Sequence, residues 1–323
     1  MTKLFKPLIS FWRIWKKIKD IRFAYRLLPE VYTPVVYSPG MKQVGEAGMP
    51  VNLKKYTAAQ LKLFGNHGEM LLKFLKSDKI GFEKANGEKE ILFIQFNNKK
   101  IRVHVYNYDN LQAIEEIFIN QVYDFHSNES YVVCDVGMNI GLASLYFASF
   151  ENVEKVYSYE PFLKTYDQAK ENLALNNELS QKIEIFPYGL GNKNEQVEVP
   201  EPANGFLGGS TTADFINELP DELKRENTSV EIQDICEIIL QIRQNHPGRK
   251  LILKLDCEGA EYEIMKKLDR ENKIGEVAVF MVEFHFKGKK DILDILVKRH
   301  YFIMSPVSDE LNQFGMLYAI KIN

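Results

Sequence analysis

The hydrophobic pattern of the chain changes near residue 131. From there on, short apolar runs of strand length alternate with stretches of helical spacing. Strands separated by helices are typical of a parallel sheet with crossover helices on both faces, and the connection between the last two runs is too short for such a crossover. The pattern therefore predicts an α/β fold with a doubly wound, seven-stranded sheet whose last strand is antiparallel. The predicted strands are YVVCDVG (131–137), VYSYEP (156–161), KIEIFPYGL (182–190), LILKLDCEG (251–259), VAVFMVEFH (277–285), YFIMSPV (301–307) and GMLYAIKI (315–322), with helices near 142–150, 165–175, 261–268 and 290–298.

The residues before this domain are predicted to form an N-terminal α+β extension. Proline and glycine punctuate residues 29–50, which indicates a linker. Beyond the linker, helical spacing at 57–76 is interrupted by Gly65 and Gly68, two runs at 91–96 and 101–106 suggest a hairpin, and 111–125 is again helical. We expect three parts: a basic amphipathic helix over 1–28, the linker and a small α+β piece over 29–130, and the α/β domain over 131–323.

Charge is unevenly distributed along the chain. Residues 1–28 contain eight Lys or Arg and a single Asp, a net charge of +7, whereas the whole chain has a formal net charge of −3. Apolar side chains recur in this segment at spacings of three and four and include both tryptophans of the chain. The pattern predicts a basic amphipathic helix, which either packs on the protein body or a second subunit, or lies on an anionic membrane surface.

Composition narrows the class of protein. The 323 residues are 45% apolar and 26% charged, which excludes a disordered or fibrous chain. No run approaches the roughly 18 apolar residues of a membrane-spanning helix, and the acidic net charge argues against a nucleic-acid partner. Three scattered cysteines do not make a disulfide framework, and the first residues lack a secretory signal, so we expect a cytoplasmic location with peripheral membrane contact, if any, through residues 1–28.

Residues suited to cofactor binding follow the first two predicted strands. In DVGMNIG (135–141), Gly137 and Gly141 permit a sharp turn and a close ligand approach, and the next helix offers free N–H groups. Asp135 suits a cation or an amino group, and Glu160 at the end of the second strand suits ribose hydroxyls. A loop that serves only tight helix–strand packing is the structural alternative.

The residue in the middle of this loop distinguishes between two classes of cofactor. A dinucleotide fingerprint needs a glycine where Asn139 stands. An acid followed by a loop without that glycine suits a cofactor that has an ammonium group and no pyrophosphate. S-adenosylmethionine fits, with its amino-acid end at Asp135 and its ribose at Glu160.

Ionisable residues crowd the ends of the fourth and fifth predicted strands. Asp256, Glu258 and Glu261 follow the fourth strand, and Glu283 and His285 end the fifth. Carboxylates gathered at one strand end raise each other's pKa, which is a mark of working sites. In the structural alternative, Glu258 and Glu261 stabilise the amino end of the following helix.

These motifs together resemble the FkbM-type family, class I S-adenosylmethionine-dependent methyltransferases with a Rossmann-like fold that usually O-methylate sugars or other hydroxyl-bearing metabolites. The resemblance covers about residues 100–322, and its most specific motif is K-x-D-x-E-G-x-E. It is carried by EEIFINQVY (115–123), DVGMNIG (135–141), YSYEP (157–161), PYGLGN (187–192), LKLDCEGAE (253–261) and VEFH (282–285).

The resemblance implies S-adenosylmethionine as cofactor, S-adenosylhomocysteine as product, and a small molecule or glycan as acceptor. Met138 stands where the family usually has a small residue, so we expect a narrower loop beside the methionine part of the cofactor. The implied cofactor-binding residues are Asp135, Gly137, Met138, Asn139, Gly141, Glu160, Pro161 and Gly189.

Methyl transfer to a hydroxyl requires an acceptor oxygen in line with the methyl group and a base for its proton. Asp256, Glu258 and His285 are the predicted catalytic residues. His285 is the preferred base because imidazole titrates near neutral pH, and Asp256 is its rival. A divalent metal held by Asp and Glu residues is a further option that the sequence does not favour.

A long segment between Leu190 and Val230 contains several prolines and glycines and is predicted to be a loop. Its stretch 205–215 is interpreted either as a lid over the cofactor or acceptor, with Ser210, Thr211 and Thr212 lining a sugar site, or as a plain solvated loop.

Two other functions are weighed against methyl transfer. A Rossmann-type oxidoreductase with a nicotinamide cofactor would need the missing central glycine. A non-catalytic, membrane-associated binding module would keep the fold without cofactor affinity, and the acids at 135, 160 and 256 argue against it.

Overall fold

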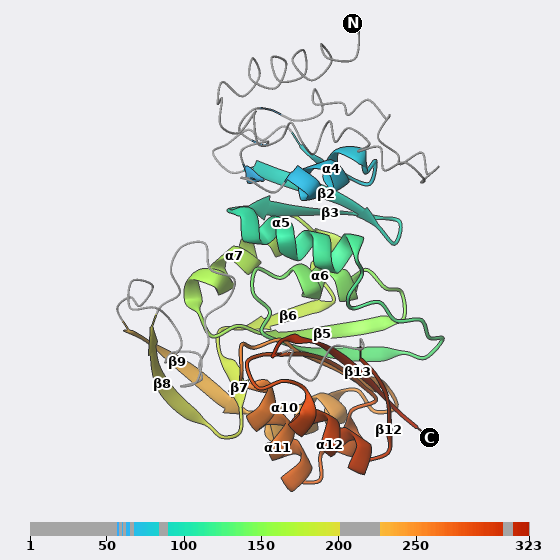
Figure 1. Ribbon diagram of the computed structural model, residues 1–323, viewed down its shortest axis with the longest axis vertical. Helices are drawn as coiled ribbons and strands as arrows, with labels where there is room; N and C mark the ends of the chain where they lie inside the picture. The colour runs from blue at the N-terminus through green and yellow to red at the C-terminus, as the bar shows by residue number, and fades with distance from the viewer. Residues whose placement is uncertain are drawn as a thin grey trace, which may run out of the picture. The chain divides into compact units, whose positions relative to one another are not determined.

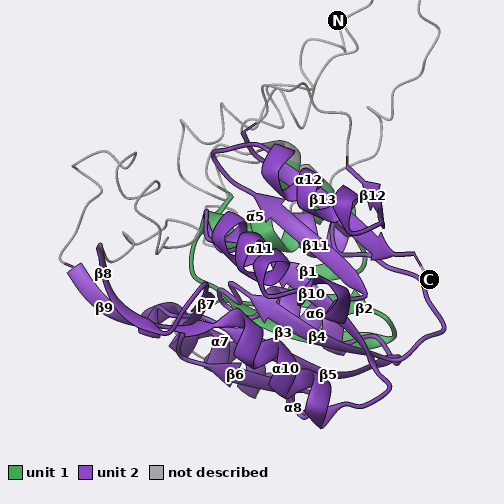
Figure 2. Ribbon diagram, turned by 90° about the horizontal axis from the view of Figure 1, so that it is seen from below, with its two compact units in different colours: residues 1–115 green, residues 116–323 purple. Residues whose placement is uncertain are grey.

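The computed structural model describes residues 57, 60, 63–64, 68–83, 90–200, 227–305 and 313–322. The chain divides into two compact units, residues 1–115 and residues 116–323, which Figure 2 colours separately. The basic segment 1–28 lies outside the described residues, so both interpretations of it stay predictions. Among the described residues, no helix combines the length and the apolarity needed to cross a membrane.

The second unit is built on a seven-stranded sheet with the strand order β12-β13-β11-β10-β4-β5-β6. All pairs are parallel except those of β13, which runs antiparallel to both β11 and β12. The predicted α/β fold with an antiparallel last strand is therefore confirmed. The strands are β4 (Tyr131–Val136), β5 (Val153–Tyr159), β6 (Ile183–Phe186), β10 (Lys250–Leu255), β11 (Val279–Phe284), β12 (Tyr301–Met304) and β13 (Gly315–Lys321).

Helices cover both faces of this sheet (Figure 1). All six residues of β4 and five of the six in β10 are buried, which explains why these central strands are almost continuously apolar. One face packs on the helices α10, α11 and α12 through a single apolar cluster that includes Ile239, Met265 and Leu296. The helices are α6 (Leu142–Ala148), α7 (Leu163–Ala174), α8 (Asn177–Ser180), α10 (Ile235–Asn245), α11 (Glu261–Arg270) and α12 (Lys290–Lys298).

The strand order reverses between β4 and β10. After β4 the chain proceeds through α6 to β5 and β6 on one side, and after β10 it proceeds through α11 to β11 on the other. The loops that leave β4 and β10 therefore diverge, and a crevice opens at the carboxyl ends of these two adjacent strands. Both groups of predicted site residues follow these strands.

A smaller three-stranded sheet corrects two predictions. The run 182–190 is not one strand, because Pro187 follows β6 and the chain then enters β7 (Gly189–Gly191) of the smaller sheet. The segment 190–230 is not simply a loop, since β8 (Glu195–Pro200) and β9 (Asn227–Asp234) pair within it. Only alternate residues of β9 are buried, so its apolar signal is sparse. The predicted lid at 205–215 lies outside the described residues.

The first unit contains α4 (Gly68–Lys76), β1 (Ile80–Phe82), β2 (Glu90–Phe96), β3 (Lys99–Val105) and α5 (Tyr108–Ile114). The predicted hairpin is confirmed, and Asn97 and Asn98 both take positive φ values, as its tight turn requires. The helix predicted over 111–125 is too long. The α-helix ends at Ile114, and a π-helical turn at Glu115–Ile119 continues the chain into the second unit.

Candidate active site

The loop between β4 and α6 is shaped by three residues with left-handed backbone. Gly137, Asn139 and Gly141 have φ values of 79°, 53° and 85°. The N–H groups of Gly137 and Met138 donate to the carbonyl oxygen of Tyr159 at the end of β5. A Cβ atom on Gly137 would lie 1.8 Å from the carbonyl oxygen of Asp256, so only glycine lets the β4 and β10 loops approach this closely.

Glu160 fixes the same loop from the end of β5. Its Oε2 accepts a hydrogen bond from the N–H of Asn139 at 3.0 Å, and its Oε1 accepts one from the N–H of Phe162 at 3.1 Å. Burial disfavours the ionised carboxylate and raises its pKa to about 7, although the two hydrogen bonds act in the opposite direction. Glu160 is therefore a buried acid that titrates near neutral pH.

A pocket lies at these strand ends, with a volume of about 550 Å³ including its open mouth. Five predicted cofactor residues line the pocket, and so do two predicted catalytic residues. The lining consists of Val136, Gly137, Asn139, Glu160, Pro161, Gly189, Leu190, Asp256, Cys257, Glu258 and Ala260.

Three predicted cofactor residues do not line the pocket. Asp135 is completely buried, and the side chain of Met138 is buried as well. Gly141 begins α6 beside Leu173. Asp135, Met138 and Gly141 therefore lie in or beside the loop between β4 and α6 without lining the pocket. Their predicted contacts with the cofactor stay predictions.

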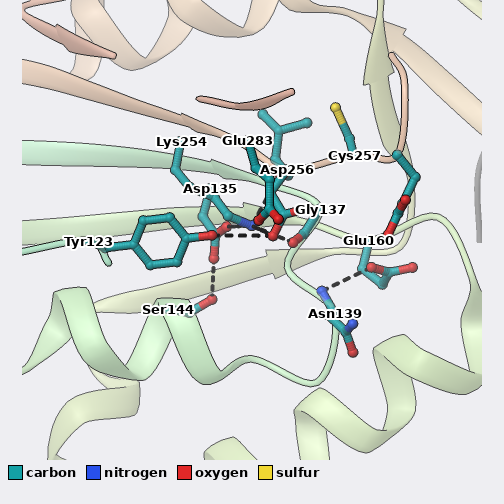
Figure 3. Close-up of polar contacts among 12 residues, drawn as sticks. Tyr123, Asp135, Gly137, Asn139, Ser144, Glu160, Lys254, Asp256, Cys257 and Glu283 are labelled. Carbon is teal, nitrogen blue, oxygen red and sulfur yellow. Dashed lines mark hydrogen bonds and ion pairs between the residues drawn. The ribbon is translucent and has the colours of Figure 1, made fainter. Parts of the chain in front are cut away.

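A buried lysine joins the two loops. The Nζ of Lys254 donates to the carbonyl oxygen of Gly137 at 2.6 Å, and it lies 3.1 Å from Asp135 Oδ1 and 3.4 Å from Asp256 Oδ2 (Figure 3). Ser144 on α6 donates to the other oxygen of Asp135 at 2.7 Å. Burial alone would lower the pKa of Lys254, but the carboxylates of Asp135 and Asp256 outweigh it and raise that pKa. Lys254 therefore stays charged and links the loop between β4 and α6 to the β10 loop.

Tyr123 also reaches this cluster, from the segment before β4. Its hydroxyl donates to Asp256 Oδ2 at 3.2 Å, and its ring lies beside the Lys254 ammonium (Figure 3). No local pattern in the sequence predicts a role for this tyrosine, because the contact joins positions 133 residues apart.

A second polar network surrounds His285 at the end of β11. Glu261 is completely buried, and its two oxygens accept hydrogen bonds from the N–H groups of Cys257 and Gly259, each at 2.8 Å. His285 Nδ1 lies 3.1 Å from Glu261 Oε1, while its Nε2 faces Glu258 Oε2 at 3.7 Å. Glu261 thus shapes the β10 loop and orients the imidazole, and its stabilisation of the amino end of α11 stays a prediction.

The electrostatics of this network change the assignment of the base. Burial lowers the pKa of His285, but its hydrogen bond with Glu261 and the nearby carboxylates raise that pKa to about 9 overall. The imidazole therefore carries a proton at neutral pH, contrary to the premise on which His285 was preferred. Burial raises the pKa of Glu258 to about 7. Glu258 has a φ of 54°, an uncommon backbone conformation that turns this carboxylate into the pocket lining.

Comparison with known proteins places these features in a family. The profile described as the methyltransferase FkbM domain matches residues 135–304, which is more than half of the chain. The chain belongs to the FkbM methyltransferase family. The resemblance drawn from the sequence motifs is thereby confirmed.

Relatives of this FkbM domain include two fungal methyltransferases. Methyltransferase sdnD of Sordaria araneosa is 29% identical over 182 residues, which cover 49% of this chain and 68% of the relative. Methyltransferase 1 of Beauveria bassiana is 26% identical over 172 residues, 49% of this chain and 67% of the relative. The AMB antimetabolite synthetase AmbE of Pseudomonas aeruginosa is 26% identical over 235 residues, 61% of this chain but 11% of that protein.

Among solved structures, the FkbM methyltransferase of Methylobacillus flagellatus KT is similar, with 17% sequence identity and a TM-score of 0.39. That similarity covers 61% of this chain and 44% of the other.

Proposed function

We propose that the protein is an S-adenosylmethionine-dependent methyltransferase that O-methylates a hydroxyl of a sugar, glycan or related metabolite. One observation carries the proposal. A single pocket is lined by the glycine loop of β4 and the carboxylate of Glu160 on one side, and by Asp256 and Glu258 on the other. A cofactor and an acceptor that share this pocket would meet where the β4 and β10 loops touch. Membership of the FkbM family supports methyl transfer as the reaction class.

The residues present fit the proposed cofactor. Glu160 is a buried carboxylate that accepts hydrogen bonds, which suits ribose hydroxyls. Pro161 and Leu190 give the pocket apolar lining, and the acids at its far side favour a cationic ligand. When bound, S-adenosylmethionine supplies an electrophilic methyl group on a sulfonium ion.

The other side of the pocket suits a hydroxyl acceptor. Asp256 is held by Tyr123 and Lys254, so its orientation is fixed before any ligand binds. Fixed polar groups accelerate a reaction because they need no reorganisation in the transition state. Asp256 and Glu258 are the pocket carboxylates able to take the hydroxyl proton, whereas the protonated His285 is suited to hydrogen-bond donation or to holding Glu258.

Ligand binding tests the cofactor half of the proposal. In titration calorimetry, S-adenosylhomocysteine should bind the full chain, and Glu160→Ala should weaken that binding by about 1–3 kcal/mol, as expected for a charged hydrogen-bond partner. Glu184→Ala, which removes an exposed glutamate on β6, is the matched control and should bind normally. If NAD stabilised the protein against heat and S-adenosylhomocysteine did not, the nicotinamide-dependent alternative would replace this proposal.

Product analysis tests the acceptor half. The full chain and labelled S-adenosylmethionine are incubated with glycans and small metabolites extracted from cells that lack the protein. Label should enter a hydroxyl-bearing compound that cells with the protein already contain in methylated form. Label transferred only to nitrogen or carbon would contradict O-methylation.

A further inference from the structure

Three side chains with metal-ligating atoms converge beside the cofactor pocket. Asp256, Glu283 and His285 each offer one ligand atom, and these three atoms lie within 4.8 Å of one another. They come from the carboxyl ends of β10 and β11, which are neighbouring parallel strands. Two ligands of one divalent ion lie about 3–4 Å apart when each bond is close to 2.1 Å. A small side-chain rotation would therefore bring the three atoms to bonding distance.

The imidazole of His285 holds a proton at neutral pH that a metal ion would displace, and the ring is oriented as a ligand would be. Its Nδ1 is engaged by the buried carboxylate of Glu261 at 3.1 Å, which leaves Nε2 to face the cluster. The side chain is only 7% exposed, and within the described ranges Nε2 has no partner at hydrogen-bonding distance; its nearest carboxylate oxygens, on Glu258 and Glu283, are 3.7 and 4.0 Å away. Metal-binding histidines almost always donate their other nitrogen to such a carboxylate or to a carbonyl.

The two carboxylates are equally suited. The contacts that the Asp256 carboxylate makes with Tyr123 and Lys254 both go to Oδ2, so Oδ1 keeps its lone pairs with respect to the described residues. Glu283 is partly exposed, and its contact with His285 is at 4.0 Å, beyond hydrogen-bonding distance. Figure 3 shows Glu283 and Asp256 close together beside Lys254.

Carboxyl groups also outnumber basic groups at this place. Five carboxylates, from Asp135, Asp256, Glu258, Glu261 and Glu283, face one lysine and one histidine. The positive charge of the cofactor does not account for the whole cluster, because Glu283 and His285 are absent from the pocket lining.

We propose that Asp256, Glu283 and His285 bind a divalent metal ion next to the cofactor pocket. Two carboxylates and one imidazole are a mixed oxygen and nitrogen ligand set, which suits Mn²⁺ or a similar transition metal better than Mg²⁺, whose preferred ligands are all oxygen. Three protein ligands leave coordination positions open, as in catalytic rather than structural metal sites.

The ion also specifies the acceptor, and this step rests on the proposed function. A metal site with open positions would suit an acceptor that offers two neighbouring oxygens, as in a vicinal diol or a 2-hydroxy acid. Coordination lowers the pKa of a bound hydroxyl and fixes its direction. The acceptor class is therefore a compound in which the methylated hydroxyl has an oxygen substituent on the adjacent carbon.

Binding of Mn²⁺ alone, followed by electron paramagnetic resonance, tests the site without any turnover. The full chain should bind one Mn²⁺ saturably. Glu283→Gln and His285→Gln should each weaken this binding at least about tenfold, the scale on which changes around a metal site act. Glu263→Gln makes the same change at an exposed position of α11 and should leave Mn²⁺ binding unaltered.

Titration with S-adenosylhomocysteine on the same samples separates this inference from the proposed function. Each variant that binds it like the unsubstituted protein is folded at the pocket, so a loss of Mn²⁺ binding there supports the metal site. The metal site is wrong if the protein binds S-adenosylhomocysteine but no stoichiometric Mn²⁺, or if neither substitution weakens Mn²⁺ binding. If Mn²⁺ binds and is lost in both variants while S-adenosylhomocysteine never binds, the metal site holds and the proposed function fails.

Discussion

The two sides of the pocket satisfy their polar groups in different ways. On the β4–β5 side, Glu160 accepts hydrogen bonds from backbone N–H groups, and the loop amides donate to the carbonyl oxygen of Tyr159. On the β10–β11 side, the pocket carboxylate of Asp256 instead contacts the side chains of Tyr123 and Lys254. The first side is fixed by backbone geometry and suits a ligand of constant shape. The second side holds ionisable side chains that orient one another, which suits chemistry.

The largest effect should come from the contact between the two sides at Gly137. Gly137→Ala puts a Cβ 1.8 Å from the carbonyl oxygen of Asp256, a clash between backbones that no side-chain rotation relieves. We expect destabilisation above about 4 kcal/mol and no S-adenosylhomocysteine binding. Chemical denaturation measures the first and calorimetry the second.

Gly248 provides the matched control for that substitution. It has a φ of +82°, close to that of Gly137, but a Cβ there would meet nothing within 4 Å. Gly248→Ala should therefore cost only the conformational term, about 1–2 kcal/mol. Equal losses in the two variants would show that the loops do not depend on their close approach.

The next effect concerns Lys254, which touches both sides. Lys254→Met leaves the completely buried Asp135 without its cation and should lower the free energy of unfolding by about 3–5 kcal/mol. Adding Asp135→Asn should restore much of this loss. Lys170→Met, which removes an exposed partner of Asp167, should cost no more than about 1 kcal/mol. A similarly small loss for Lys254→Met would mean that Asp135 finds another partner.

Asp256 should separate turnover from cofactor binding. Asp256→Asn is expected to lower kcat by about 10²–10⁴ with the acceptor identified by product analysis. The affinity for S-adenosylhomocysteine should change little, because Glu160 and the β4 loop are intact. If instead the affinity for S-adenosylhomocysteine fell and kcat at saturation were unchanged, Asp256 would contribute to cofactor binding and not to turnover.

The smallest effect is a pH dependence of the affinity for S-adenosylhomocysteine, which arises from Glu160 on the β4–β5 side. Glu160 has a pKa of about 7 in the free protein, and hydroxyl donors of a ligand favour its ionised form. Binding then lowers this pKa, so affinity for S-adenosylhomocysteine should be constant above pH 7 and decrease as pH falls below 7. The decrease approaches tenfold per pH unit. Glu160→Gln should abolish this dependence, and a dependence that persisted would assign it to another group.

The β4–β5 side of the pocket was more predictable from the sequence than the β10–β11 side, because its geometry is local. The turn after β4 is local, so Gly137, Asn139 and Gly141 could be located from spacing within one segment, and all three do have left-handed backbone. Glu160 was predictable because it ends the next parallel strand.

The β10–β11 side of the pocket was predictable only in part. The motif K-x-D-x-E-G-x-E includes Lys254 and Glu261. It does not predict that Lys254 bridges the β4 and β10 loops, or that Glu261 orients His285. The base preference for His285 failed because a pKa depends on neighbours that a linear pattern does not place. The strands β8 and β9 were missed because their small apolar contact, Val199 and Val230 against Phe162, leaves few apolar positions in the sequence.

The hydrogen bond from Tyr123 to Asp256 has a consequence for recombining domains of this family. The family match begins at residue 135, whereas the second compact unit begins at residue 116 and contains this tyrosine. A chimaera joined at the start of the family match would inherit Asp256 without the hydroxyl that orients it. It would also lose the Val122 carbonyl to which Tyr318 of β13 donates. The transferable module therefore extends upstream of the family signature by at least the segment 116–134.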